Sequence, residues 1–188
     1  MCPPLFVASF TKTIKKTSVY KVFEIGCGSG VTANMLHQSG YKVVGIDASK
    51  MGIEQANKAF PQLQLYHGSA YDNLSDVYGQ FPIVVSLEVV EHLYDPRQFA
   101  KTFYNLLEED GLGIISTPYH GYFKNLALAI TGKMDAHFTA LWDGGHIKFW
   151  SMETLKQLLL EAGFRDIYFI RVGRVPMLAK SMIAVFRK

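Results

Sequence analysis

The chain has 188 residues, of which 49% are hydrophobic and 19% charged, and this content suits one domain with a buried core rather than a disordered segment. The formal net charge of +3 is too small for a nucleic-acid-binding composition, and no apolar run is long enough to cross a bilayer. The length suits a single domain over residues 1–188. The cysteines, Cys2 and Cys27, are too few for a disulfide scaffold, so we expect a cytoplasmic protein.

Residues 1–20 are expected to form a short leader with a helix over residues 8–16. The apolar run Val22–Ile25 then predicts the first strand. Three glycines at alternate positions follow it: Gly26, Gly28 and Gly30. The amphipathic segment 31–39 predicts a helix directly after them. Glycine lets the backbone of such a corner take positive φ, and the N-terminus of the helix favours nucleotide-like ligands.

The spacing of these glycines separates two kinds of nucleotide site. A dinucleotide fold places glycine at the position of Val31, so a nicotinamide dehydrogenase is the weakest interpretation. The loop, preceded by the acidic Glu24, resembles motif I of the class I S-adenosylmethionine-dependent methyltransferases. That resemblance implies that the loop, with Cys27 inside it, wraps the methionine part of the cofactor and that Glu24 lies beside it.

The second predicted strand, Lys42–Asp47, ends in a carboxylate at the edge where ligands of open α/β sheets bind. A carboxylate in this place accepts hydrogen bonds from the ribose hydroxyls of an adenosine, and Ala48 follows it. The alternative is that Asp47 caps the N-terminus of a helix predicted over residues 51–60.

The third predicted strand, Gln64–His67, leads into a turn over residues 68–72. The resemblance implies that this turn holds the adenine of the cofactor. The family often has aspartate followed by alanine here, whereas this chain has Ser69 and Ala70. The difference moves the expected contact to the serine hydroxyl, the Ala70 backbone or Asp72.

The remaining elements complete an alternating pattern. Further strands are predicted over 81–87, 112–117, 166–172 and 181–187, and helices over 96–107 and 151–163. Asp110-Gly111 is expected to stop the first of these helices, and residues 173–179 to form a turn with Pro176. A connection that short cannot be a parallel crossover. The sequence therefore predicts an α/β, Rossmann-like class I methyltransferase sandwich: a seven-stranded, mostly parallel sheet with one antiparallel strand and helices on both faces.

Residues 119–146 form an unusually long connection, because such loops normally have ~2–6 residues. The segment is rich in aromatic and aliphatic residues, and a helix is predicted over residues 122–131. The segment follows strand five at the position of the substrate cap in the class I methyltransferases, so the resemblance implies a substrate cap here, and long loops at such an edge are often functional. The alternative is a satellite core cluster without a ligand.

The residues Glu88, Glu91 and His92 follow strand four at i, i+3 and i+4, so in a helical turn they would share one face. His146 follows the cap and could lie over them. Glu-x-x-Glu-His with the later histidine resembles the ubiquinone-biosynthesis O-methyltransferases, as do residues 128–132 and 145–149. The same four residues resemble the metal ligands of the small-RNA 2′-O-methyltransferases.

Three interpretations of this group remain open. His92 or His146, with Glu91, could be the general base that deprotonates a hydroxyl. Glu88, Glu91, His92 and His146 could bind a divalent metal ion that lowers the pKa of the substrate oxygen. Alternatively, the group only caps the helix or holds the cap in place.

The resemblance implies methyl transfer from S-adenosylmethionine, with S-adenosylhomocysteine as product, to a small-molecule acceptor. We expect the acceptor atom to be an oxygen of a phenolic, quinone-like or otherwise apolar compound, and no nucleic acid partner. The alternatives are a sugar or glycan-precursor methyltransferase and a non-catalytic binding module of the same fold, and the cap could touch a membrane surface. The expected cofactor-lining residues are Glu24, Gly26, Cys27, Gly28, Gly30, Asp47, Ala48, Ser69, Ala70, Leu87 and Glu88.

Overall fold

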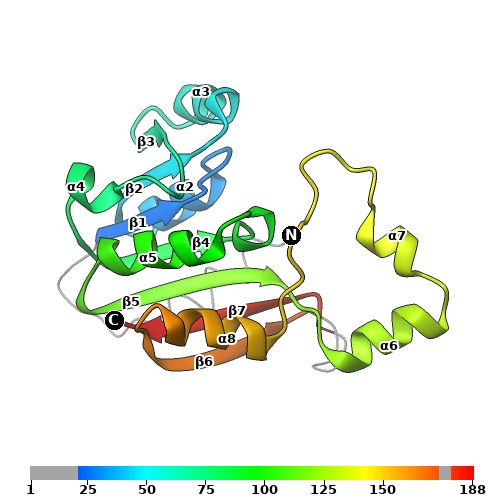
Figure 1. The fold of residues 1–188 in the computed structure, drawn as a ribbon. Helices are drawn as coiled ribbons and strands as arrows, with labels where there is room; N and C mark the ends of the chain where they lie inside the picture. The colour runs from blue at the N-terminus through cyan, green and yellow to red at the C-terminus, as the bar shows by residue number, and fades with distance from the viewer. Residues whose placement is uncertain (1–20, 174–178) are drawn as a thin grey trace.

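The computed structural model describes residues 21–173 and 179–188, and in this part seven strands form one sheet in the order β3-β2-β1-β4-β5-β7-β6 (Figure 1). The strands are β1 (Lys21–Ile25), β2 (Lys42–Asp47), β3 (Gln64–His67), β4 (Phe81–Leu87), β5 (Leu107–Pro118), β6 (Arg165–Val172) and β7 (Ser181–Arg187). β1 to β5 pair in parallel, whereas β7 runs antiparallel to both of its neighbours. The predicted seven-stranded mixed sheet is confirmed. The expected helix over residues 8–16 and the turn at Pro176 lie outside the described residues.

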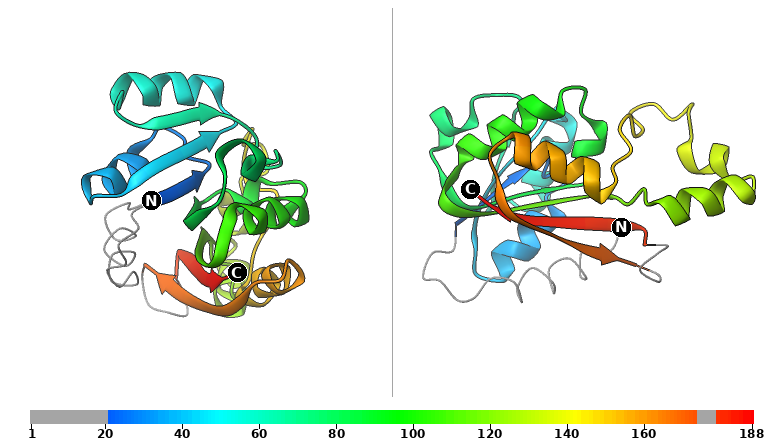
Figure 2. Two further views of the ribbon diagram at one scale, coloured as in Figure 1. Left: turned by 90° about the vertical axis from the view of Figure 1, so that its left-hand side faces the viewer. Right: turned by 60° about the horizontal axis from the view of Figure 1, so that its bottom comes forward.

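Helices cover both faces of this sheet (Figure 2). The helical segments are α2 (Val31–Gln38), α3 (Lys50–Ala59), α4 (Leu74–Tyr78), the 3-10 turn η1 (Val90–His92), α5 (Pro96–Leu106), α6 (Tyr122–Ile130), α7 (Met134–Phe138) and α8 (Met152–Glu161). The apolar sides of α2 and α3 pack in one hydrophobic cluster, and those of α5 and α8 in a second. The sheet thus lies between two cores.

The strands feed the two cores alternately because successive side chains of a strand point to opposite faces. In β1, Val22 lies in the cluster with α2 and α3, whereas Phe23 and Ile25 lie in the cluster with α5 and α8. In β4, Val84 and Val85 divide in the same way and are both fully buried. Apolar residues at consecutive positions are therefore required in these central strands.

Side-chain caps fix the start of three helices. Ser49 accepts a hydrogen bond from the Gly52 backbone before α3, and Asp95 accepts one from Gln98 before α5. Ser151 and Thr154 form a reciprocal capping box at the start of α8. Each cap satisfies a backbone N–H that the first turn of a helix leaves without a partner.

The segment between α5 and β5 differs from the prediction. Asp110-Gly111 was expected to stop the helix, but α5 ends at Leu106 and β5 begins at Leu107. Leu107 is fully buried and pairs with Phe81, so the chain leaves the helix early to place this side chain in the core. The pairing then shifts, and the bulge that contains the exposed Asp110, with φ 60°, precedes Leu112.

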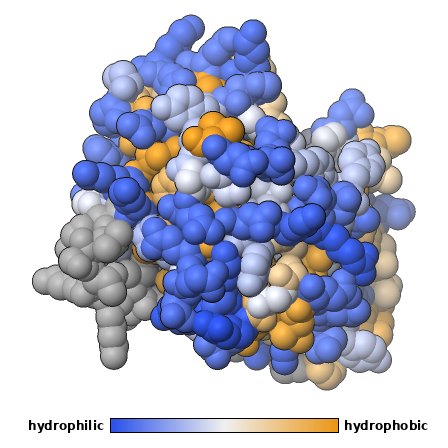
Figure 3. All heavy atoms as spheres, turned by 60° about the vertical axis from the view of Figure 1, so that its left-hand side comes forward, coloured by the Kyte–Doolittle hydropathy of each residue, from blue (hydrophilic) through white to orange (hydrophobic). Residues whose placement is uncertain are grey.

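Helices α6 and α7 project from the carboxyl edge of the sheet as an arm (Figures 1 and 2). Neither helix contains a buried residue, and Tyr122, Phe123 and Ile130 are among the exposed large apolar side chains. These two helices therefore contribute no side chain to a buried core. The opposite side of the molecule is mostly hydrophilic, with apolar colour in small separate areas (Figure 3). In the described part of the chain, no helix has the length and apolar character that crossing a membrane requires.

Candidate functional site

The carboxyl ends of the parallel strands meet at one edge, and the glycine loop after β1 is bonded to the end of β2 there. The backbone N–H groups of Gly26 and Cys27 donate to the Ile46 carbonyl at 2.8 and 2.9 Å. The Gly28 N–H donates to Oδ2 of Asp47 at 2.8 Å. These bonds hold the loop open in front of α2, in the arrangement predicted from the sequence.

The three glycines all have positive φ, but their surroundings differ. A Cβ on Gly26 would lie 2.3 Å from Cγ2 of Val89, in the turn that precedes η1, and one on Gly30 would meet Leu65 at 2.9 Å. A Cβ on Gly28 would have nothing within 4 Å. Gly26 and Gly30 therefore allow close packing, whereas Gly28 faces open space in which a ligand can approach the backbone.

Asp47 is not the N-cap of α3, because Ser49 fills that position. The two oxygens of the Asp47 carboxylate accept from the backbone N–H groups of Gly28 and Ser49, each at 2.8 Å. A carboxylate has about four acceptor sites, so lone pairs remain for a ribose. The alternative prediction, that Asp47 caps the N-terminus of this helix, is wrong.

Glu24 is buried beneath this loop, with 2% of its surface exposed, and its Oε2 atom has no hydrogen-bond partner. Burial, followed by repulsion from Asp47, raises the pKa of the Glu24 carboxyl from 4.5 to about 8. Burial also raises the pKa of the neighbouring Cys27 thiol, so this cysteine is not a reactive thiolate. An unpaired buried carboxyl is costly and is the kind of group that a cationic ligand would satisfy.

The turn expected to hold the adenine is closed on itself. The Ser69 N–H donates to Oδ2 of Asp72 at 2.7 Å, and the Ser69 hydroxyl accepts from the Tyr71 N–H at 3.2 Å. The side chains of Ser69 and Asp72 are thus already bonded within the turn. The backbone of Ala70, which is only partly buried, remains as a contact for a ligand.

Glu88 does not share a helical face with Glu91 and His92. Only Val90–His92 form a turn of 3-10 helix, and Glu88 precedes it with φ 57°. The Glu88 carboxylate accepts from the Ser116 hydroxyl at 2.8 Å and is held against β5. The predicted helical face is wrong for this residue, and the four-residue group is reduced to three.

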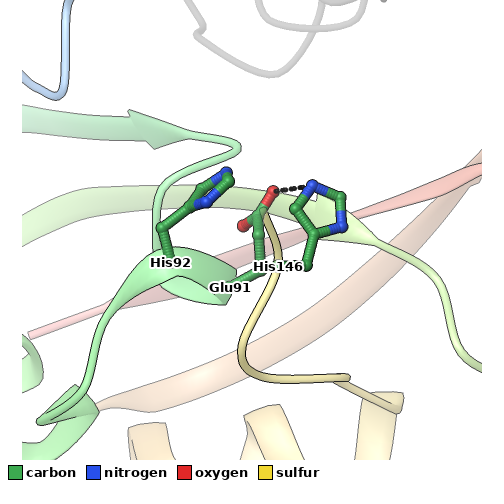
Figure 4. A group of neighbouring side chains, drawn as sticks. All are labelled: Glu91, His92 and His146. Atoms are coloured by element: carbon green, nitrogen blue, oxygen red, sulfur yellow. Dashed lines mark ion pairs between the residues drawn. The ribbon is translucent and has the colours of Figure 1, made fainter. Parts of the chain in front are cut away.

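The other three residues do meet, as Figure 4 shows. Glu91 and His92 come from η1 and His146 from the segment that returns from α7; the two histidine rings are 4.9 Å apart. Nε2 of His146 lies 4.0 Å from Oε1 of Glu91, an atom that is buried without a hydrogen-bond partner. The ligand atoms of the three residues lie within 4.8 Å of one another.

Backbone bonds hold His146 in this position. The Glu91 carbonyl accepts from the N–H groups of Ile147 and Lys148, each at 2.9 Å. Nδ1 of His92 lies 3.2 Å from the Gly145 carbonyl. Because a carbonyl can only accept, this bond places a proton of His92 on Nδ1.

Two residues of the cluster, Glu91 and His146, favour their neutral forms. Burial, followed by repulsion from Glu88, raises the pKa of Glu91 to about 8, although the Thr117 hydroxyl donates to it at 3.0 Å. Burial and the neighbouring His92 lower the pKa of His146. At neutral pH the Glu91–His146 contact is thus a neutral pair, and His146 is in the form that accepts a proton.

A pocket of about 550 Å³ lies between the arm and the end of β5. It is lined by Pro118, His120, Lys124, Ala127, Leu128, Thr131, Lys133, Ala136, His137, Phe138, His146, Phe149 and Lys180. His146 belongs both to this pocket and to the cluster. The sequence assigned no role to His120, although its place directly after strand five was a signal; nothing in the sequence indicated Lys180.

Comparisons with known proteins place the chain in a family. A model of the methyltransferase domain family matches residues 6–168. The ubiquinone biosynthesis O-methyltransferase of Ruegeria pomeroyi is 32% identical over 154 residues, which are 78% of this chain and 60% of the relative. The enzyme of the same name from Bartonella bacilliformis is 33% identical over 164 residues, 84% of this chain and 64% of the relative. The chain thus spans about half to two-thirds of the length of such relatives.

The fold defines the class: an α/β sheet of the Rossmann-like methyltransferase type. An S-adenosylmethionine-dependent methyltransferase from Mesorhizobium loti superposes with a TM-score of 0.72 at 14% identity, over 96% of both chains. The YcgJ protein of Bacillus subtilis gives 0.73 at 14% identity, over 97% of both chains. With the sequence matches, the chain belongs to the methyltransferase domain family.

Proposed function

We propose that this chain transfers a methyl group from S-adenosylmethionine to an oxygen of a small-molecule acceptor. The contact of Gly26 with Val89 carries this proposal, because it packs the predicted cofactor loop against the turn that presents Glu91 and His92. A cofactor over the loop would then have the cluster beside it. Such juxtaposition of donor and base is what an in-line transfer requires.

The residues at the loop fit the cofactor. The Glu24 carboxyl, buried and unpaired, would receive the ammonium of the methionine part, and the open space over Gly28 admits the main chain of that part. Asp47 would accept from the ribose hydroxyls, and the Ala70 backbone would contact the adenine. When bound, the cofactor supplies an electrophilic methyl carbon on a sulfonium.

At the acceptor end, His146 is the proposed general base. It is neutral, it lines the pocket, and backbone bonds between Glu91 and the residues after it hold it in place. It would take the proton of the acceptor hydroxyl as that oxygen bonds to the methyl carbon and the carbon–sulfur bond breaks. Glu91 and His92 flank the imidazole and set its position.

The second candidate role of the same cluster is metal binding, with Glu91, His92 and His146 as ligands of a divalent ion. One carboxylate and two imidazoles within 4.8 Å of one another suit several metals. A bound ion would also compensate the buried Oε1 atom of Glu91, which has no hydrogen-bond partner. Loss of an Mg²⁺ effect in Glu91→Gln would support this mode.

For the acceptor we propose a phenolic, quinone-like or otherwise apolar compound. Phe138 and Phe149 stack edge to face at 4.7 Å in the lining of the pocket, which suits a flat ring. A sugar or glycan precursor is the alternative within the class, since rings also stack on sugars. Turnover of labelled cofactor with a panel of phenols, catechols and sugars separates these from a non-catalytic binding module, which would bind cofactor without turnover.

Residues 119–146 are the proposed substrate cap of a single domain. The exposed apolar side chains of α6 also suit a peripheral membrane contact, which co-sedimentation of wild type and Phe123→Asp with liposomes would test.

The buried thiol of Cys27, the unpaired cysteine among the described residues, supports a reducing cytoplasmic location.

The decisive experiment is calorimetric titration with S-adenosylhomocysteine, with and without Mg²⁺. We expect binding by the wild type and at least about tenfold weaker binding by Asp47→Ala, since each lost charge-assisted hydrogen bond contributes ~1.5–3 kcal/mol. Glu108→Ala is the control, because this exposed glutamate lies in the bulge before Leu112, at the other end of β5. A wild type that does not bind would overturn the catalytic proposal and leave a methyltransferase-shaped scaffold.

A further inference from the structure

The pocket beneath the arm has a one-sided charge distribution. Lysines from three segments line it: Lys124 on α6, Lys133 before α7 and Lys180 before β7. No aspartate or glutamate is among the lining residues in the part of the chain that the structure describes. Lys124 is half-buried, and its Nζ is anchored by a 2.7 Å bond to the Tyr119 carbonyl, so at least one cation is built into the wall.

His120, directly after β5, lines the same pocket. Its side chain is buried, with 7% of the residue exposed. Burial lowers the pKa of His120 to about 4, and hydrogen bonding with the neighbouring Asn125 amide opposes this shift. A neutral imidazole carries one N–H donor and one acceptor nitrogen, so His120 can contribute a hydrogen bond at the pocket wall.

We propose that this pocket holds a carboxylate or phosphate group of the acceptor, with Lys133 and Lys180 as counter-charges and His120 as a hydrogen-bond partner. The proposal rests on the proposed function and names its substrate class: a hydroxylated, partly apolar compound that carries an anionic group. His146 lines the same pocket, so the reacting oxygen would lie toward the cluster and the anion toward the lysines. Charge attraction in a partly enclosed pocket exceeds that at an open surface.

The test uses simple probes of one ring and one functional group. The whole chain is titrated calorimetrically, in the presence of saturating S-adenosylhomocysteine if this ligand binds. The titrated ligands are benzoate, its neutral counterpart benzyl alcohol, and inorganic phosphate. We expect benzoate to bind at least five times more tightly than benzyl alcohol. The double variant Lys133→Met/Lys180→Met should lose at least tenfold in benzoate affinity and keep its benzyl alcohol affinity.

The control is Lys156→Met, because Lys156 is exposed on α8 and does not line the pocket. Equal affinity for benzoate and benzyl alcohol, or equal benzoate affinity in the double variant and the control, overturns the proposal. Vesicles of phosphatidylglycerol test the other source of phosphate. Lysine-dependent vesicle binding without benzoate or phosphate binding assigns the lysines to lipid headgroups and also overturns it.

The same samples separate this inference from the proposed function. Cofactor binding without a preference for benzoate removes the anionic substrate class and leaves the methyltransferase proposal in place. A lysine-dependent preference for benzoate without cofactor binding keeps the anion site and overturns the methyltransferase proposal.

Discussion

Gly26 and Gly28 belong to one motif but have different surroundings. Both have positive φ, which side chains disfavour. Gly26 lets Val89 approach the loop, whereas Gly28 leaves its backbone open. The first glycine is thus required by packing between two segments of the protein, whereas the second borders open space that our proposal assigns to the cofactor.

We therefore expect Gly26→Ala to destabilise the protein more than Gly40→Ala does. Both residues have positive φ, but a Cβ on Gly40 has nothing within 4 Å. Backbone strain of ~1 kcal/mol is common to both variants, and the contact with Val89 adds about 1–3 kcal/mol for Gly26→Ala alone. Urea unfolding measures the difference.

Val89→Ala in the Gly26→Ala background is the companion variant, because it removes the atoms with which the new Cβ collides. It should restore part of the lost stability. If the Gly26→Ala and Gly40→Ala variants are equally stable, the close packing of loop and turn is not the reason for glycine at this position.

The element whose sequence signal was strongest is α8. Its start combines Ser151 at the N-cap with Thr154 at the third position, and their side chains and backbones bond reciprocally. Leu155, Leu158 and Leu159 are the buried face of the helix. This local arrangement needs no distant contact, which is why the boundary was predicted within a residue or two.

We expect Ser151→Ala to lower the free energy of unfolding by about 1 kcal/mol, because it leaves a first-turn N–H without its acceptor. Ser151→Asp should retain most of the stability, since aspartate caps as well as serine. Lys156→Ala, at an exposed position of the same helix, is the control and should change stability by less than ~0.5 kcal/mol. Equal losses in Ser151→Ala and Ser151→Asp would contradict the capping explanation; thermal or urea unfolding decides.

For the whole molecule, the structure predicts that stability depends on pH. The folded chain holds protons on Glu24 and Glu91 up to about pH 8, whereas the unfolded chain releases them near pH 4.5. Because the folded state binds more protons in between, the free energy of unfolding falls as the pH rises through this range. Burial lowers the pKa of His120 to about 4 and acts in the opposite direction, but only below about pH 6.5.

We therefore expect the ligand-free protein to lose on the order of 3 kcal/mol between pH 6.5 and pH 8, measured by urea unfolding. Glu24→Gln should reduce this loss, because it removes one of the two groups. Glu54→Gln, at an exposed position of α3, is the matched control and should follow the wild type. Stability that stays level or rises over this window would show that the two carboxyls are ionised in the folded chain.

The sequence by itself determined the sheet, its antiparallel strand, the glycine loop and the long helical connection after β5. It could do so because these depend on local periodicity, on glycine at fixed positions and on connection lengths, which are all written along the chain. The position of the Glu88 side chain could not be predicted from the sequence. The hydroxyl of Ser116 on β5 binds its carboxylate, and the positive φ of Glu88 turns the residue away from the cluster. Only the tertiary structure decided that His146 reaches Glu91, and that Lys180 joins a pocket with His120, because these residues are distant in sequence and meet only through packing.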